Sequence, residues 1–230
     1  MSRIFLTLAG IAGVGLVVTG INLLQNPRGA NAPAIPAFAP LPTRVPTLAV
    51  PPLALVAGHS GNDSGAVCPD GTREVDITTD VARRAKAILE ARGYRVDILQ
   101  EFDARLSATR RDYAPAAFLA IHVDSCIDYA SGYKVARAAN SAIPQEDDRL
   151  VRCVTAAYAA ATLLPFHEGS ITNNMLHYHG LNEINPQTPG AIIELGFLGS
   201  NGDLLKNKRE LLAQGVADGV DNFVRGNECR

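Results

Sequence analysis

The sequence predicts an α/β domain with a mostly parallel central sheet sandwiched between helices. Short apolar runs alternate with longer helical stretches from residue 53 onward, which is typical of a parallel sheet covered by helices. Two of these runs, residues 117–123 and 191–195, are apolar on both faces, as the central strands of such a sheet are. With 47% hydrophobic and 19% charged residues in a chain of 230, the composition suits one globular domain with one core.

The expected elements follow in chain order. A strand at 53–57 leads into a loop at 58–71 that is rich in Gly, Asn, Asp and Ser. Apolar residues then recur at spacings of three and four from Ile77 to Ile88, which indicates a helix, and Gly93 stands where a helix C-cap is expected. Further strands are expected at 95–99, 117–123 and 191–195, and helices at 74–92, at 145–164 and, as two nearly continuous helices, within 203–225.

The N-terminal segment is predicted to direct the chain to a membrane. Residues 4–24 carry no charge and are long enough to cross a bilayer as a helix, and Arg3 before them favours a cytoplasmic N-terminus. We expect a membrane anchor at 1–26. The alternative is a cleaved signal with its cleavage site at residues 30–32, and either reading places the folded domain outside the cytoplasm.

A proline-rich segment separates this anchor from the domain. Residues 27–52 contain eight prolines, a density that favours extended, polyproline-like chain. We therefore expect a semi-stiff tether at 27–52 and a single catalytic domain at 53–230.

The charge excludes one class of function. The net charge is −2, and the first 52 residues hold three arginines and no acidic residue, so the rest of the chain is more acidic than the whole. A nucleic-acid binder needs a basic face. Tryptophan is absent and aromatic residues make up 6%, which leaves few platforms for stacking bases.

Four residues with metal or acid–base chemistry are expected at one edge of the sheet. His59 lies two residues after the first strand, His122 ends the third and Glu194 stands near the end of the last. Sites in parallel sheets form at the carboxyl ends of strands. Glu74 begins a helix on the same stripe as the apolar residues that follow it, so its carboxylate faces inward and needs a partner.

This residue set is that of a catalytic zinc site. Two histidines and one carboxylate, here His59, His122 and Glu74, commonly bind zinc and leave a fourth position to water. Glu194, within an apolar strand, then suits the general acid/base. Each residue also has an ordinary interpretation, such as a core histidine for His122 or a helix-dipole partner for Glu74.

Four motifs in this order resemble one family, the zinc-dependent N-acetylmuramoyl-L-alanine amidases (amidase type 3). They are GHSGNDSGA at 58–66, Glu74, AIHVD at 120–124 and IELGFL at 193–198. The resemblance implies Zn²⁺ on His59, Glu74 and His122, catalysis by Glu194, and peptidoglycan as the substrate, cut between muramic acid and L-alanine. The family's usual Asp-Pro before the first histidine is Val56-Ala57 here.

The segment 173–179, NNMLHYH, also departs from the common family sequence. His177 and His179 would share one face on a strand, so they could bind a metal or, as we prefer, line the substrate cleft. The cleft residues expected in this chain are Asn174, His177, His179 and Asp124.

The chain has four cysteines, none in a C-x-x-C pair, which argues against a structural zinc finger. Four cysteines allow three pairings, and an oxidising compartment favours disulfides. Cys68 follows His59 and Cys126 follows the His122 strand, so a bridge between them could brace the site. Cys153 and Cys229 could then pin the C-terminus.

Two other functions remain open at this point. A zinc amidase or peptidase of the same fold could act on another substrate, which the departures at 173–179 suggest. A catalytically silent module could bind the cell wall without turnover, although all four chemical residues are present. Oligomeric state and activating partners are not indicated by the sequence.

Overall fold

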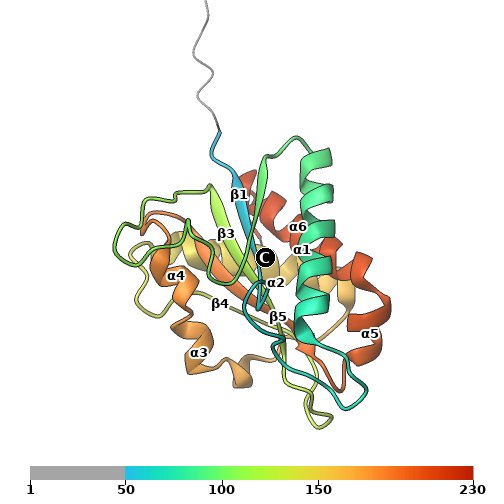
Figure 1. Cartoon of the computed structure of the whole chain (residues 1–230). Coiled ribbons are helices and arrows are strands. Elements are labelled where there is room, and N and C mark those ends of the chain that lie inside the picture. Colours follow the sequence, from blue (N-terminus) through green and yellow to red (C-terminus); the bar gives the residue numbers. More distant parts are fainter. Residues whose placement is uncertain (1–49, 230) are drawn as a thin grey trace, which may run out of the picture. The chain divides into compact units, whose positions relative to one another are not determined.

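The computed structural model describes residues 50–229, which contain one five-stranded sheet in the order β2-β1-β3-β5-β4 (Figure 1). The first four strands of this order are mutually parallel, and only β4 runs antiparallel to its neighbour β5. The strands are β1 (Leu53–Ala57), β2 (Val96–Leu99), β3 (Ala117–Asp124), β4 (Lys134–Ala136) and β5 (Gly190–Phe197). The predicted fold class, a mostly parallel sheet between helices, is confirmed.

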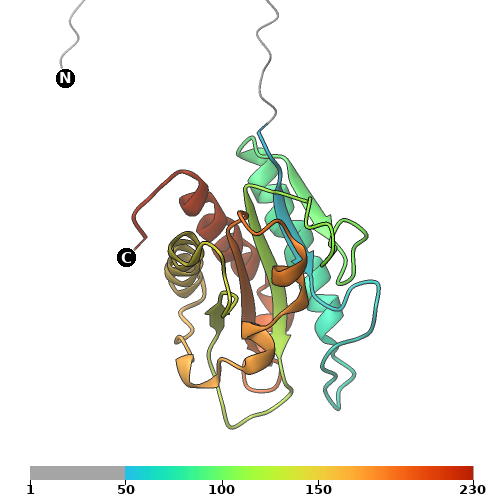
Figure 2. The same ribbon diagram turned by 90° about the vertical axis from the view of Figure 1, so that its left-hand side faces the viewer.

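Helices cover both faces of the sheet (Figures 1 and 2). The larger core lies on the face where inward residues such as Leu55 and Ile121 meet the helices α1, α2 and α6. The other face packs Phe118 and Ile192 against α3 and α4. The helices are α1 (Glu74–Ala91), α2 (Pro144–Thr162), α3 (Asn173–Leu176), α4 (His179–Glu183), α5 (Gly202–Asn207) and α6 (Arg209–Val224), with a short 3-10 helix at Glu168–Ser170.

The strongly patterned elements form where they were predicted, with ends that differ by one or two residues. The strand at 53–57 has the predicted bounds, and α5 and α6 are separated by the single residue Lys208. Four short elements were not predicted: β4, the 3-10 helix, α3 and α4. Each has three to five residues, too few for a hydrophobic period to appear.

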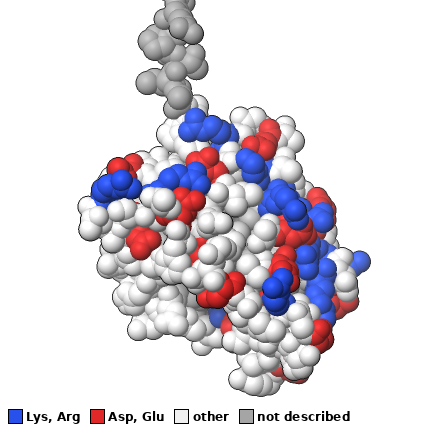
Figure 3. All heavy atoms as spheres, in the orientation of Figure 1, with Lys and Arg blue, Asp and Glu red and all other residues white. Residues whose placement is uncertain are grey.

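The expected anchor at 1–26 and nearly all of the tether at 27–52 lie outside the described residues. Within residues 50–229, no helix combines the length and the apolar character needed to cross a membrane. On the face of the domain shown in Figure 3, basic and acidic side chains are interspersed.

Two disulfides join distant parts of the chain. Cys68 is bonded to Cys126, and Cys153 is bonded to Cys229. The first links the loop after β1 to the segment after β3, so it ties together two segments that border the candidate site. The second attaches the C-terminal tail to α2.

Removing the Cys68–Cys126 bridge is expected to destabilise the domain by about 4 kcal/mol, because the bridge closes a loop of 58 residues in the unfolded chain. The double variant Cys68→Ala/Cys126→Ala should therefore unfold at a lower denaturant concentration than the intact protein. The matched control removes Cys153 and Cys229 instead, which should cost a similar amount because their separation is 76 residues. Peptide mapping under non-reducing conditions that found four free thiols would contradict both bridges.

Candidate metal centre and catalytic cleft

Parallel pairing brings three of the four expected residues to one edge of the sheet. His122 on β3 and Glu194 on β5 are direct partners in the strand register. The chain turns immediately after β1, so that His59 lies above the same edge, and Gly58 donates its N–H to Ile121 of β3. Thr78 of α1 donates its hydroxyl to the Gly58 carbonyl, which holds α1 against this turn.

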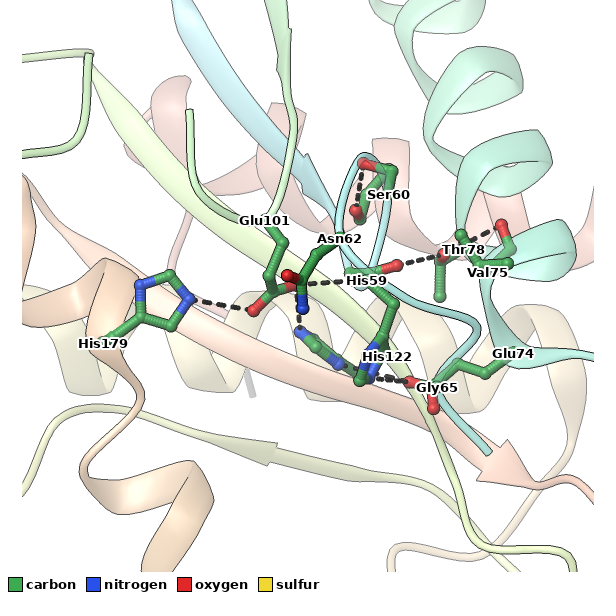
Figure 4. Close-up of polar contacts among 12 residues, drawn as sticks. His59, Ser60, Asn62, Gly65, Glu74, Val75, Thr78, Glu101, His122 and His179 are labelled. Atoms are coloured by element: carbon green, nitrogen blue, oxygen red, sulfur yellow. Dashed lines mark hydrogen bonds and ion pairs between the residues drawn. The ribbon is translucent and has the colours of Figure 1, made fainter. Parts of the chain in front are cut away.

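Glu74 joins this group from the first position of α1. It is buried, as the apolar stripe of the helix predicted. Its Oε1 atom lies 3.3 Å from His59 Nε2 and 3.2 Å from His122 Nδ1 (Figure 4). One ligand atom from each of these three residues lies within 4.8 Å of the others. The structure thus brings together His59, Glu74 and His122 as a group that could hold a metal ion.

The backbone around Glu74 positions its carboxylate. Oε1 accepts a hydrogen bond from the Val123 N–H, and Oε2 accepts one from the Ala66 N–H, each at 2.9 Å. Burial works against the charged carboxylate, but hydrogen bonds from the two histidines and these two amides outweigh it and lower the pKa of Glu74 to about 2. Glu74 is therefore an anion at neutral pH.

The turn that carries His59 is unusual in its backbone. His59 has a φ of 66°, in the left-handed region that residues with side chains seldom adopt. Its Nδ1 contacts Asp63 Oδ1 at 2.5 Å, so the ring is oriented with Nε2 toward Glu74. Gly65 completes the turn at a φ of 62°, where a Cβ would come within 2.4 Å of the Glu74 carboxylate. Only glycine allows this close approach.

Glu194 adjoins this group without belonging to it. Part of its surface opens toward the cleft, whereas its Oε2 atom is enclosed and accepts no hydrogen bond from residues 50–229. Burial raises the pKa of Glu194 to about 7, although the positive charge of a protonated His122 opposes the rise. A carboxylate in this state can accept and return a proton near neutral pH.

The donor set fits zinc. Tetrahedral zinc with ligand bonds near 2.0–2.1 Å places its ligand atoms roughly 3.3 Å apart, which matches the separations of Glu74 Oε1 from His59 Nε2 and from His122 Nδ1. The region is rich in negative charge: burial opposes a charge on His122, but the carboxylates of Glu74, Glu194 and Glu101 together raise its pKa. The buried Lys134 beside them is already paired with Asp124. Burial of several carboxylates requires a compensating cation.

A cleft of about 560 Å³ opens over these residues, and it includes all four of the expected cleft residues, Asn174, His177, His179 and Asp124. Asn174 and His177 are exposed within it. Asp124 is paired with Lys134, which also donates to the Ser170 carbonyl.

His177 and His179 do not lie on a strand, so the shared face that a strand would give them does not form. His177 follows α3 and His179 begins α4, because Met175 of α3 and Tyr178 between the two histidines pack into the core of the domain. Both ring nitrogens of His179 are bonded to protein carboxylates: Nε2 to Glu101 at 2.9 Å and Nδ1 to Glu183 at 3.0 Å. The group that could hold a metal includes neither histidine.

The sequence interpretation missed Glu101. This residue follows β2 and is 6% exposed, and its carboxylate accepts a hydrogen bond from the His59 backbone N–H at 2.6 Å. In the sequence it is one acid in a polar segment after a strand, which is ordinary for a loop. Its position next to the site depends on β2 pairing with β1, which no local pattern specifies.

The fold and the site define a class. An α/β domain that gathers two histidines and a carboxylate at its sheet edge, with a second carboxylate beside them, is a candidate metal-dependent hydrolase. The family model of N-acetylmuramoyl-L-alanine amidase matches residues 53–222. The chain belongs to this family, as its four motifs indicated.

Individual relatives agree with this assignment. The chain is 35% identical over 81 residues to the N-acetylmuramoyl-L-alanine amidase AmiC of Neisseria meningitidis serogroup B, which covers 33% of this chain and 19% of that protein. It is 25% identical over 177 residues to the "Probable cell wall amidase LytH" of Staphylococcus saprophyticus, covering 73% and 56%. The chain thus matches less than two thirds of either relative's length.

Among solved structures, the N-acetylmuramyl-L-alanine amidase Ami1 of Mycobacterium smegmatis superposes with a TM-score of 0.65. The identity is 21%, and the match covers 76% of this chain and 97% of that one. This likeness establishes that the two share a fold.

Proposed function

We propose that this protein hydrolyses the amide bond between N-acetylmuramic acid and L-alanine in peptidoglycan, with zinc held by His59, Glu74 and His122. The observation that carries the proposal is the convergence of three ligand atoms within 4.8 Å, next to Glu194, a carboxylate that is not among them. Membership in the amidase family supplies the substrate class.

Each metal ligand has a defined donor atom. His59 would bind through Nε2, His122 through Nδ1 and Glu74 through its carboxylate, because these atoms face one another. Zinc, when bound, supplies a Lewis acid that polarises a carbonyl and makes water a better nucleophile at neutral pH. The chain's own contribution is to hold these three donors in a fixed geometry at the end of an open cleft.

Glu194 would transfer the proton. As a carboxylate it removes a proton from the attacking water, and as a carboxylic acid it returns that proton to the leaving nitrogen of L-alanine. The products are a free muramic acid carboxylate and a stem peptide with a free amino group. Burial raises the pKa of Glu194 to about 7 in the metal-free chain, well above that of an ordinary carboxyl group, which favours its use as both base and acid.

The location outside the cytoplasm is part of the proposal. Peptidoglycan lies there, and the two disulfides favour an oxidising compartment. We propose that residues 1–26 direct the chain across the membrane and either anchor it or are removed, with residues 27–52 as the tether.

Digestion of purified peptidoglycan by the full chain tests the proposed function. We expect mass spectrometry to find stem peptides with a free L-alanine amino group, together with intact glycan strands. The control is the same digest with a metal chelator added, in which the stem peptides should stay attached to the glycan strands. Products that keep the muramic acid–alanine bond, such as shortened glycans or cleaved stem peptides, would contradict the proposal.

A further inference from the structure

Glu101 is a buried carboxylate between the two candidate histidine ligands and a third histidine. It is 6% exposed and follows β2, whereas its partners come from the β1 turn, from β3 and from α4 (Figure 4). The proposed reaction does not use it. Keeping a carboxylate buried is costly unless hydrogen bonds stabilise it, so its contacts need an explanation.

The first contact holds the His59 turn. Glu101 Oε2 accepts the His59 backbone N–H at 2.6 Å, and the Glu101 backbone N–H donates to the Ser60 carbonyl at 3.0 Å. These two bonds fasten both sides of a residue whose φ of 66° is unfavourable for histidine. Without these two bonds, the backbone of the turn would be less restrained, and the His59 ring would be held less firmly toward Glu74.

The second contact concerns the ring of His122. Its Nδ1 faces Glu74, and its Nε2 is buried without a hydrogen-bond partner among residues 50–229. Glu101 Oε2 lies 3.6 Å from this Nε2. A histidine that binds a metal through one nitrogen is neutral, carries its hydrogen on the other and donates it to a carboxylate, a backbone carbonyl or water. A small movement would complete this bond.

The third contact holds Glu101 itself. His179 Nε2 lies 2.9 Å from Glu101 Oε1, and His179 Nδ1 lies 3.0 Å from Glu183 Oε2. The ring also stacks on Phe102, with 4.4 Å between the ring centroids. His179 is therefore fixed on two edges and one face, and it directs one oxygen of Glu101 away from the ligands.

We propose that Glu101 is a positioning residue that orients both histidine ligands, and that His179 positions Glu101. The proposal rests on the zinc site proposed above. Glu101 differs from Glu194 in its task, because both of its oxygens already face N–H donors, whereas Glu194 Oε2 has no hydrogen-bond partner in the described part of the chain. Glu101 is thus built to hold groups in place, and Glu194 is free to take a proton.

The variant Glu101→Gln in the full chain tests this. It keeps the shape and one oxygen, but its NH₂ group cannot accept hydrogen bonds from the histidines. We expect zinc affinity, measured by competition with a chelator, to fall about 10–100-fold. Excess zinc should restore part of the activity, which would not happen if the variant had merely lost its fold. Asp103→Asn is the matched control, since Asp103 lies two residues away and bonds to Arg105.

A second pair of variants keeps the test decisive should Glu101→Gln fold poorly. His179→Gln retains a donor for Glu101 and should weaken zinc binding less than His179→Leu, which has none. Unchanged zinc affinity in Glu101→Gln, or equal affinities in the two His179 variants, would overturn the positioning role. Failure of the unmodified chain to bind zinc would instead refute the metal site, so the two proposals can be separated.

Discussion

The variant Glu194→Gln is expected to hydrolyse peptidoglycan about 10²–10⁴-fold more slowly than the unmodified chain while it still binds one zinc ion. Glutamine has nearly the same shape as glutamate, but it can neither take a proton from water nor deliver one to a leaving nitrogen. Glu194 is not in the metal group, so metal content should not change. Rates from the digestion assay and metal analysis of the same samples measure both effects.

Glu210→Gln is the matched control for this variant, because Glu210 is an exposed carboxylate of α6 that pairs with Arg84 of α1, away from the metal group. It should retain full activity. A Glu194→Gln chain that kept zinc and lost no activity would falsify the assignment of the proton-transfer residue.

The pH dependence should report the same group. Burial raises the pKa of Glu194 from 4.5 to about 7, and the base must be deprotonated to act, so activity should fall as the pH drops through the pKa. Bound zinc favours the carboxylate form and moves this acidic limb downward, so we expect it at or below pH 7. A limb clearly above pH 7 would contradict the role of Glu194.

The raised pKa of Glu194 also predicts how the stability of the folded chain depends on pH when a chelator keeps the protein free of metal. Above about pH 7, the folded chain keeps an ionised carboxylate that burial disfavours, and below pH 4.5 that carboxylate is neutral in both the folded and the unfolded chain. The melting temperature of Glu194→Gln relative to the unmodified chain should therefore rise as the pH increases between these values. A constant difference across that range would argue against the shift.

Replacing His59 with alanine is expected to abolish stoichiometric zinc binding, and activity with it. Two donors would remain where three now converge, and the loss should exceed the roughly 10–100-fold cost of removing an outer partner of a ligand. His59 is partly exposed at the cleft, so its truncation should leave the buried core intact. Elemental analysis of the purified protein gives the zinc content directly.

His167→Ala serves as the control for metal loss, because the His167 ring bonds to Ser170 and lies against Phe197 instead of Glu74. This variant should bind zinc as the unmodified chain does. If His59→Ala still bound one zinc ion per chain with unchanged affinity, the proposed metal site would have to be abandoned.

Local patterns were sufficient for the elements that carry the four chemical residues. The strands around His122 and Glu194 are apolar on both faces, so their burial and their central positions follow from composition. The periodicity of α1 placed Glu74 on the buried stripe, because the helical repeat determines which side chains share a face.

Short elements depend on long-range contacts instead. Strand β4 has three residues and exists because it pairs with β5, where Lys134 faces Glu194 in the register. The helix α4 has five residues, and burial of Leu181 against the sheet maintains it. The short helices α3 and α4 on either side of His177 were not predicted for the same reason, since intrinsic preference over so few residues is weaker than packing.

For this protein, the sequence by itself determined the fold class, the edge of the sheet at which His59, His122 and Glu194 meet, and the inward direction of Glu74. These follow from strand and helix periods, which are properties of neighbouring residues. The tertiary structure alone decided which atoms of these residues face one another, and it brought Glu101 and His179 beside them. Those contacts join segments up to 78 residues apart, and such contacts form only when the whole domain packs.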